Sequence, residues 1–253
     1  FIAFIPGHGN LYTLSVRNKV KITMKKEILL PLIALLSGVL LTLMIMSNSY
    51  LSTFTSPLHA SWLTHGIGAI VALIIWLTVK KHLPPRHAGT KMPLWCYLGG
   101  IPGAFTVLLA AITVNRPLSL SGSIVLMLAG QIVTGLIIDH FGLMGLTRRK
   151  VTRRADTAAV IQRLYFDHCR KIMMLLFYIT IALTNGICII FSRSINGRLS
   201  QSSNAFYASL VNHIAGFIFL SVVVLFYLPQ FPVTLNSIPL ITFTAGIIGA
   251  CFV

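Results

Sequence analysis

The sequence predicts an all-α, polytopic helical membrane protein with about seven transmembrane helices arranged in two tandem repeats. The chain has 253 residues, of which 56% are hydrophobic and 9% are charged, whereas soluble domains carry about 25% charged residues. Its mean hydropathy is +0.86. A chain with so few polar side chains cannot cover a water-facing surface. Disorder is excluded too, because disordered chains are rich in charge and poor in apolar residues.

Apolar segments without Asp, Glu, Lys or Arg follow one another along the chain. A bilayer core about 30 Å thick is crossed by a helix of roughly 20 residues. Six segments reach about that length, namely residues 28–46, 60–79, 94–114, 118–138, 172–191 and 205–228. A seventh, 238–253, runs to the last residue. Each segment is therefore predicted to form a transmembrane helix.

The charge is strongly biased, with 20 Lys and Arg against 4 Asp and Glu, a net charge of +16. Threading the spans puts residues 1–27, 80–93 and 139–171 on one side, and these segments contain seventeen of the twenty basic residues. Arg116, Arg193 and Arg198 are predicted on the other side. The positive-inside rule then places the amino terminus in the cytoplasm. The charge indicates membrane topology rather than a nucleic-acid partner.

The start of the chain has two interpretations. Met24-Lys25-Lys26 followed by an apolar helix is a common beginning for a bacterial inner-membrane protein, so residues 1–23 are predicted to be a tail upstream of the true start. The alternative is a cleaved signal, although no clear small-x-small cleavage site follows the apolar run. The basic segment 147–171 is predicted to be a cytoplasmic linker, either an amphipathic helix on the inner leaflet or an ordinary connection.

An internal repeat appears at an offset of 148 residues. Gly38, Asn48, Ser61, His65 and Gly68 align without a gap with Gly186, Asn196, Ser209, His213 and Gly216. Shared polar residues in otherwise apolar helices are unlikely to coincide by chance. The predicted organisation is a first repeat of four helices over 24–146, the linker 147–171, and a second, incomplete repeat of about three helices over 172–253. Whether the two repeats run parallel or inverted stays open.

Internal repeats in a polytopic protein favour a secondary transporter with its substrate site near the repeat interface. The leading hypothesis is therefore an inner-membrane transporter, and specifically an exporter of small organic solutes or metabolites by alternating access. The alternative is a non-transporting membrane scaffold or partner subunit. A membrane enzyme ranks third, since no nucleophile–base pair is visible.

The candidates for the substrate pathway are polar residues inside the spans. Ser61 and His65 share one helix face with Gly68, and Ser209 and His213 repeat that face. The imidazoles either bind substrate or relay protons, because histidine titrates near neutrality. Equally, each could be neutral and bonded to a backbone carbonyl. Gln131, deep in the fourth span, either ties helices together or lines the pathway.

Four further residues are candidates for helix-end or gating roles. Asn48 and Asn196 are predicted at the ends of the first helix of each repeat, where capping is favoured over substrate contact. Asp139 and His140 end the fourth helix, where Asp139 is expected to pair with Arg148 or Arg149, or to act as a cytoplasmic gate.

The sequence predicts no metal site, cofactor or catalytic residue. The four cysteines lack the spacing of metal ligands, and we expect them to pack as small apolar side chains. The expected partners are membrane lipids and a small-molecule substrate. Self-association into a homo-oligomer is compatible with the sequence.

The assembled landmarks resemble the YdcZ-type inner-membrane proteins of the drug/metabolite transporter superfamily. The most specific are Ala129-Gly130-Gln131 and Asp139-His140-Phe141-Gly142. Residues 24–146 are similar to one nearly complete copy and 172–253 to part of a second. The resemblance implies an exporter of small molecules, and it implies a fifth helix after the basic turn, where 147–171 is too charged to span.

Overall fold

The computed structural model describes residues 9–82, 92–143, 172–227 and 238–252, and the regular secondary structure in these ranges is entirely helical. The chain divides into two compact units, residues 1–40 and 41–253. The first contains the amino-terminal part of helix α1, where Ser37 Oγ donates to the carbonyl of Ala34. The second contains the rest of α1 and all other described helices.

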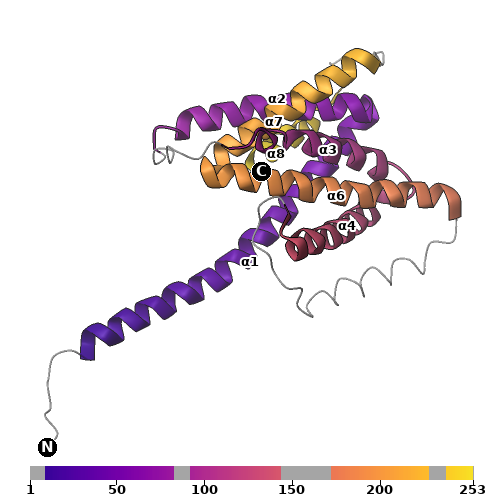
Figure 1. Cartoon of the computed structure of the whole chain (residues 1–253). Helices are drawn as coiled ribbons and strands as arrows, with labels where there is room; N and C mark the ends of the chain where they lie inside the picture. Colours follow the sequence, from indigo (N-terminus) through magenta and orange to yellow (C-terminus); the bar gives the residue numbers. More distant parts are fainter. Residues whose placement is uncertain (1–8, 83–91, 144–171, 228–237, 253) are drawn as a thin grey trace, which may run out of the picture. The chain divides into compact units, whose positions relative to one another are not determined.

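The described helices follow the order of the predicted spans (Figure 1). They are α1 (Gly9–Phe54), α2 (Pro57–Val79), the 3-10 turn η1 (Leu94–Tyr97), α3 (Gly100–Val114), α4 (Ser119–Phe141), α6 (Ile172–Ser202), α7 (Ala205–Tyr227), the 3-10 turn η5 (Leu240–Phe243) and α8 (Thr244–Phe252). Pro57 begins α2, where its missing N–H costs no hydrogen bond. Gly142, in the left-handed conformation with φ 63°, ends α4.

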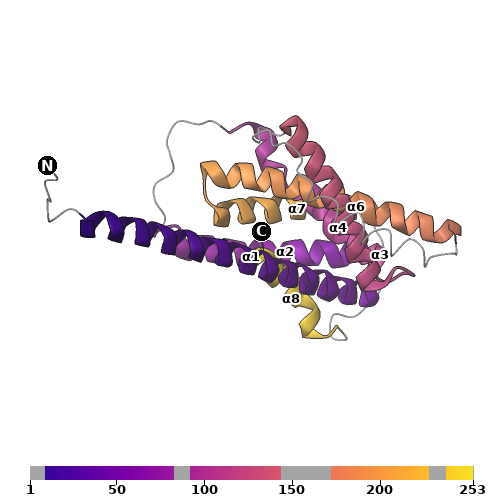
Figure 2. The same cartoon turned by 90° about the horizontal axis from the view of Figure 1, so that it is seen from below.

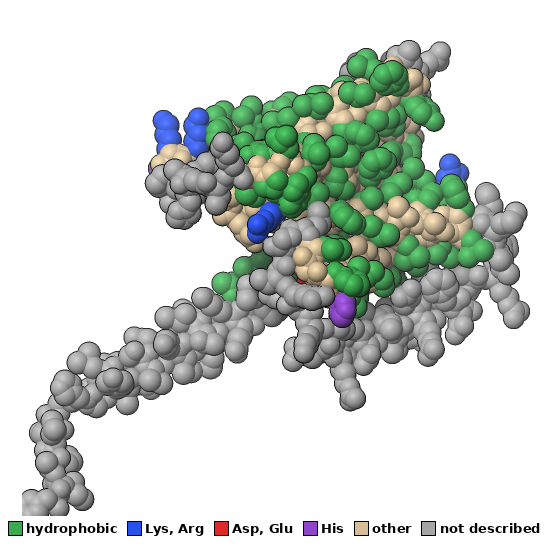
Figure 3. Space-filling view, viewed as in Figure 1, with side chains coloured by type: hydrophobic (Ala, Val, Ile, Leu, Met, Phe, Trp, Pro, Cys, Tyr) green, Lys and Arg blue, Asp and Glu red, His purple; other side chains and the backbone are tan. Residues whose placement is uncertain are grey.

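The prediction of a helical membrane protein is confirmed. Among the described residues, six helices are long and apolar enough to cross a membrane, and a shorter apolar helical segment covers Leu240–Cys251. Figure 3 shows one face of the molecule, on which hydrophobic side chains dominate and only a few Lys and Arg side chains, drawn in blue, are visible. Such a surface suits hydrocarbon, in which apolar side chains need no cover.

Two predicted helix ends were wrong, because two helices are longer than their apolar runs. The first span was predicted to end at residue 46 and the fifth at residue 191, but α1 continues to Phe54 and α6 to Ser202. Ser192, Ile195 and Leu199 are all buried. Their helical spacing continues the packed face of α6 beyond the last fully apolar turn.

Helices α2 and α7 run antiparallel against each other. Trp62 stacks on Phe217 with ring centroids 5.5 Å apart. Further along α2, the ring of Trp76 lies 6.0 Å from that of Tyr207. Contacts therefore move backwards along α7 as they move forwards along α2, so the second helices of the two repeats point in opposite directions.

Helices α4 and α6, by contrast, pack on each other and point in the same general direction, crossing at an angle that is visible in Figure 2 (compare Figure 1). Leu118, at the start of α4, packs in one cluster with Tyr178 near the start of α6. One residue in the middle of α4, Gly130, meets Gly186 in the middle of α6. The chain thus leaves α4 at one end of this pair and enters α6 at the other. Residues 144–171, including the predicted linker 147–171, lie outside the described residues.

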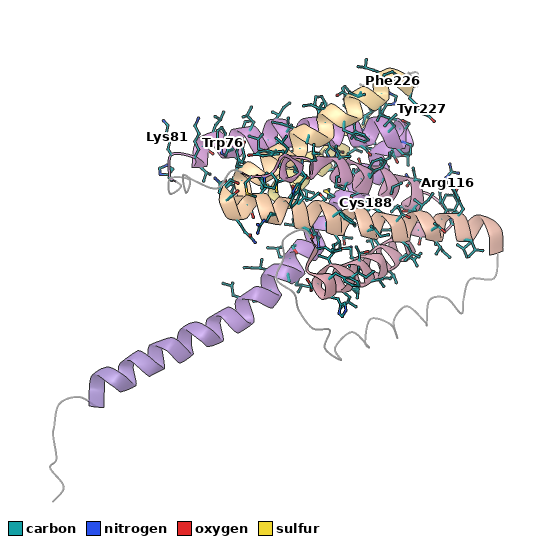
Figure 4. The ribbon with its side chains drawn as sticks, in the orientation of Figure 1. Trp76, Lys81, Arg116, Cys188, Phe226 and Tyr227 are labelled. Atoms are coloured by element: carbon teal, nitrogen blue, oxygen red, sulfur yellow. The ribbon has the colours of Figure 1, made fainter. Side chains whose placement is uncertain are left out.

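The matched helices α2 and α7 are thus antiparallel, so the two predicted repeats are arranged in an inverted and not a parallel way. One end of the helices, here called the lysine end, carries Lys80 and Lys81, and the other, the Arg116 end, carries Arg116 (Figure 4). Arg198 lies near Cys96, which packs in one cluster with Leu199. Arg198 is therefore at the lysine end. Its predicted place opposite the lysines was wrong, because threading the spans kept residues 139–171 on one side of the membrane.

Candidate functional site

The two matched histidines meet where α2 crosses α7. The ring centroids of His65 and His213 are 5.8 Å apart, and both side chains are buried. His65 Nδ1 lies 3.0 Å from the carbonyl of Ser61, and His213 Nδ1 lies 2.9 Å from the carbonyl of Ser209. Because a carbonyl only accepts, Nδ1 of each ring carries the proton and donates it. The other ring nitrogen, Nε2, faces the opposite repeat: Nε2 of His213 lies beside Gly68, and Nε2 of His65 lies beside Gly216.

Each histidine ring packs on a glycine of the opposite repeat. A Cβ added to Gly68 would lie 2.2 Å from Cδ2 of His213, and one added to Gly216 would lie 2.4 Å from Cδ2 of His65. Since Gly68 and Gly216 are themselves matched positions, the contact is reciprocal, as a two-fold relation between the repeats requires. We call these four residues the histidine–glycine contact.

Matched amides bind the first helix of each repeat to the second. Thr64 Oγ1 donates to Asn48 Oδ1 at 2.8 Å. At the equivalent place in the other repeat, Asn196 Nδ2 donates to Asn212 Oδ1, also at 2.8 Å. All four side chains are buried. In a membrane such bonds hold helices together, because an unpaired amide in hydrocarbon is costly.

Asn48 and Asn196 therefore do not cap their helices, and the favoured prediction for them was wrong. Both lie inside helices that continue to Phe54 and Ser202, and both reach sideways. Asn48 Nδ2 also donates to the carbonyl of Val107 in α3, at 3.2 Å. Their sequence position next to the last apolar turn suggested a helix end only because the helix was expected to stop there.

The serines predicted on the pathway face are buried but make different bonds. Ser61 Oγ donates to the carbonyl of Pro57 within its own helix. Ser209 Oγ donates to the carbonyl of Ala250 in α8, at 2.9 Å. Ser209 therefore ties two helices of the second repeat, whereas Ser61 folds back on α2.

Gln131 stands apart from the histidine–glycine contact, on the interface of α4 and α6. Its side chain is buried, and its Oε1 accepts a hydrogen bond from Arg193 Nη1 at 3.3 Å. Helix α4 packs chiefly on α6 and to a lesser extent on α3, so the structure does not bring Gln131 together with the histidines on α2 and α7.

Asp139 and His140 lie in the last turn of α4, at the lysine end. His140 is exposed and its ring meets that of Phe141 edge-on, with centroids 5.0 Å apart. Asp139 is partly buried. Its predicted partners, Arg148 and Arg149, lie outside the described residues.

Three polar residues that were not predicted as site candidates make interhelical contacts in the structure: Thr64, Asn212 and Arg193. Thr64 and Asn212 each precede a histidine in matched positions, a signal that a comparison of the aligned polar residues could have found. The predicted span 172–191 ends before Arg193, although Ser192, Ile195 and Leu199 continue the helical spacing on either side of it.

An inverted arrangement of membrane-spanning helices recurs in many secondary transporters. The chain belongs to the family described as "Putative inner membrane exporter, YdcZ", whose model matches residues 29–162 and 177–253. The chain is thus a multi-pass inner-membrane protein of an exporter family. Neither the curated proteins nor the solved structures contain a match to the chain.

The close packing of the histidine–glycine contact predicts that enlarging either glycine destabilises the protein. Gly68→Ala or Gly216→Ala should each destabilise the folded protein by about 1–3 kcal/mol, the usual range for overpacking a filled interior. The added methyl would overlap the facing imidazole, which must shift. Thermal unfolding of the purified protein in detergent measures the loss.

A second substitution supplies the control for this prediction. Shortening the facing side chain should relieve the overlap, so Gly68→Ala combined with His213→Ala should lose less stability than the sum of the losses of the two single variants. If the double variant is no more stable than expected from the sum of the two single losses, the ring and the glycine are not in contact.

Proposed function

We propose that this chain exports small organic solutes by alternating access, with its two inverted halves moving against each other about the histidine–glycine contact. Membership of an exporter family supports the general activity. The observation that carries the mechanism is the reciprocal contact itself: the same two residues from each half close on one another across the inverted interface.

Inverted repeats supply a physical reason for this mechanism. When two halves have the same fold but opposite directions in the membrane, exchanging their conformations converts an inward-facing arrangement into an outward-facing one. The residues about which the halves move then lie at matched positions. His65 and His213 meet this condition, as do Gly68 and Gly216.

The chemistry of the histidine pair suits a contact that opens and closes. Each Nδ1 is engaged by its own helix, so the ring keeps its orientation while Nε2 is directed at the partner half. An imidazole Nε2 accepts a hydrogen bond when neutral and donates one when protonated. In our proposal this atom binds substrate or takes a proton when the halves separate.

The cytoplasmic side in this proposal is the lysine end. Lys80, Lys81 and Arg198 gather there, against Arg116 at the other end, and positive residues favour the cytoplasm. We infer from the sequence that the amino terminus also lies in the cytoplasm, because residues 1–27 carry five basic residues and the positive-inside rule places such segments there. Asp139 and His140 would lie at the cytoplasmic mouth.

The test is export by cells. Metabolites in the medium of cells expressing the wild-type chain are compared with those of cells expressing the double variant His65→Gln, His213→Gln at equal membrane levels. At least one small solute should accumulate with the wild type and fall to the level of empty cells with the double variant. Glutamine keeps a polar side chain of similar length but cannot take a proton.

His82→Gln is the matched control, since His82 is exposed at the lysine end, and it should export as the wild type does. Full export by the double variant would remove the histidines from the mechanism. If the wild type exports nothing and a second protein co-purifies with it, the chain is instead a scaffold or partner subunit.

A further inference from the structure

Arg193 is a cation at membrane depth. It lies within the candidate membrane span Leu175–Ser202, nine residues before the end of that span. Its Nη1 reaches Gln131, a residue halfway along α4. The guanidinium is thus held near the middle of a hydrocarbon core about 30 Å thick.

A charge at this depth calls for a function. Arginine stays protonated in proteins, and a charged side chain near the bilayer centre is costly, so such residues mark substrate or ion pathways. The side chain of Arg193 is exposed on the surface of the described residues, whereas its partner Gln131 is buried. An amide of the protein interior therefore holds the guanidinium.

Gln131 acts as a positioning residue for the guanidinium. An amide oxygen that accepts one N–H orients the planar fork without neutralising its charge. Gln131 is not the only group that interacts with Arg193, but a guanidinium has five N–H donors, so these contacts are compatible with a further acceptor.

The charges elsewhere in the spans favour an anion. The chain has four acidic residues, Glu27, Asp139, Asp156 and Asp167, and Asp139 belongs to the last turn of α4. At mid-depth the described helices instead present amides, hydroxyls, imidazoles and the guanidinium of Arg193. A pathway lined in this way attracts anions and repels cations.

We propose that the exported solute carries a carboxylate or phosphate group and that Arg193, oriented by Gln131, binds it. A guanidinium matches either group with two parallel hydrogen bonds. The inference rests on the proposed function, because it names the substrate class of that transporter. It places the anionic group on the α4–α6 side of the molecule, away from the histidine–glycine contact.

Binding rather than transport tests this proposal, so that the two can fail separately. The purified full chain in detergent is titrated with benzoate, succinate and glucose 6-phosphate as anionic probes, and with tetraphenylphosphonium as the cationic probe. Thermal unfolding reports binding, because a ligand of the folded state raises the unfolding temperature. At least one anion should stabilise the wild type, and the cation should not.

The variants assign the effect to the guanidinium. Arg193→Gln should weaken the anion's binding at least tenfold. Arg193→Lys should retain part of it, since lysine keeps the charge but loses the fork, and this variant also serves if Arg193→Gln does not fold. Gln131→Leu should weaken binding without removing it. Arg116→Gln, at the opposite end, should bind as the wild type does.

The outcomes are distinct. Stabilisation by no anion, or stabilisation that survives Arg193→Gln, overturns the anion site whatever the export experiment gives. Anion binding that depends on Arg193 supports the site even if the histidine variants still export, in which case only the proposed mechanism fails. A wild type stabilised by tetraphenylphosphonium alone binds cations in place of anions, which overturns the proposal.

Discussion

Valine in place of Gly186 is expected to separate α4 from α6 and to leave little folded protein in the membrane. A Cβ at this position would lie 2.3 Å from the carbonyl oxygen of Met127 and 2.8 Å from the backbone nitrogen of Gln131. Both atoms belong to the backbone of α4, so no side-chain rotation can relieve the overlap. Glycine lets two helices approach this closely in a membrane.

The loss should be large, about 3 kcal/mol or more, the upper part of the range for overpacking. The measurement is the yield of monodisperse protein after extraction in detergent, together with its unfolding temperature. Gly197→Val is the matched control. It lies on the same helix and is exposed, and an added Cβ there would meet nothing within 4 Å, so it should behave as the wild type.

Equal yields of the two valine variants would mean that α4 and α6 are not in close contact. The Arg193–Gln131 hydrogen bond would then lose its structural basis as well, because it joins these two helices. The packing test therefore bears on the anion site without measuring any ligand.

The sequence predicted the helices well and their ends poorly. Hydropathy finds residues that cannot face water, and it located all seven apolar segments. It fails where a helix continues as a polar but still packed turn, as at Ser192 and Asn196 in α6. Those residues are buried against other helices, which no property of their own segment reveals.

Part of the candidate site could also be predicted. The matched positions of His65 and His213 indicated a shared role, and they meet in space. The packing of each ring on a glycine of the opposite repeat, His213 on Gly68 and His65 on Gly216, could not be predicted. It depends on α2 and α7 crossing in opposite directions. The pairing of Gln131 with Arg193 likewise required α4 and α6 to be parallel neighbours.

The inverted arrangement itself gives the last prediction, which is an all-or-none result. If the repeats are inverted, Lys81 after α2 and Ser203 after α6 lie on the same side of the membrane. If they ran parallel, the same two positions would lie on opposite sides. The ring contact of Trp76 with Tyr207 and the packing of Cys96 with Leu199 and Ala208 support the first arrangement.

Single cysteines test this in cells, in a background where the four native cysteines are replaced by alanine. Lys81→Cys and Ser203→Cys are compared with Thr55→Cys and Arg116→Cys, using a thiol reagent that does not cross membranes, before and after permeabilisation. Thr55 and Arg116 should react with intact cells. Lys81→Cys and Ser203→Cys should react only after permeabilisation, because the lysine end faces the cytoplasm.

Two readings of this experiment are independent. Whether positions 81 and 203 behave alike decides between inverted and parallel repeats, and which pair reacts first decides the orientation of the whole molecule. Opposite behaviour of 81 and 203 would contradict the antiparallel crossing of α2 and α7, and with it the reciprocal histidine–glycine contact. If positions 81 and 203 are both labelled from outside, the histidine–glycine contact stands and only the proposed cytoplasmic side is reversed. The assignment of that side rests on a few charges through the positive-inside rule, whereas the crossing of α2 and α7 is fixed by packing.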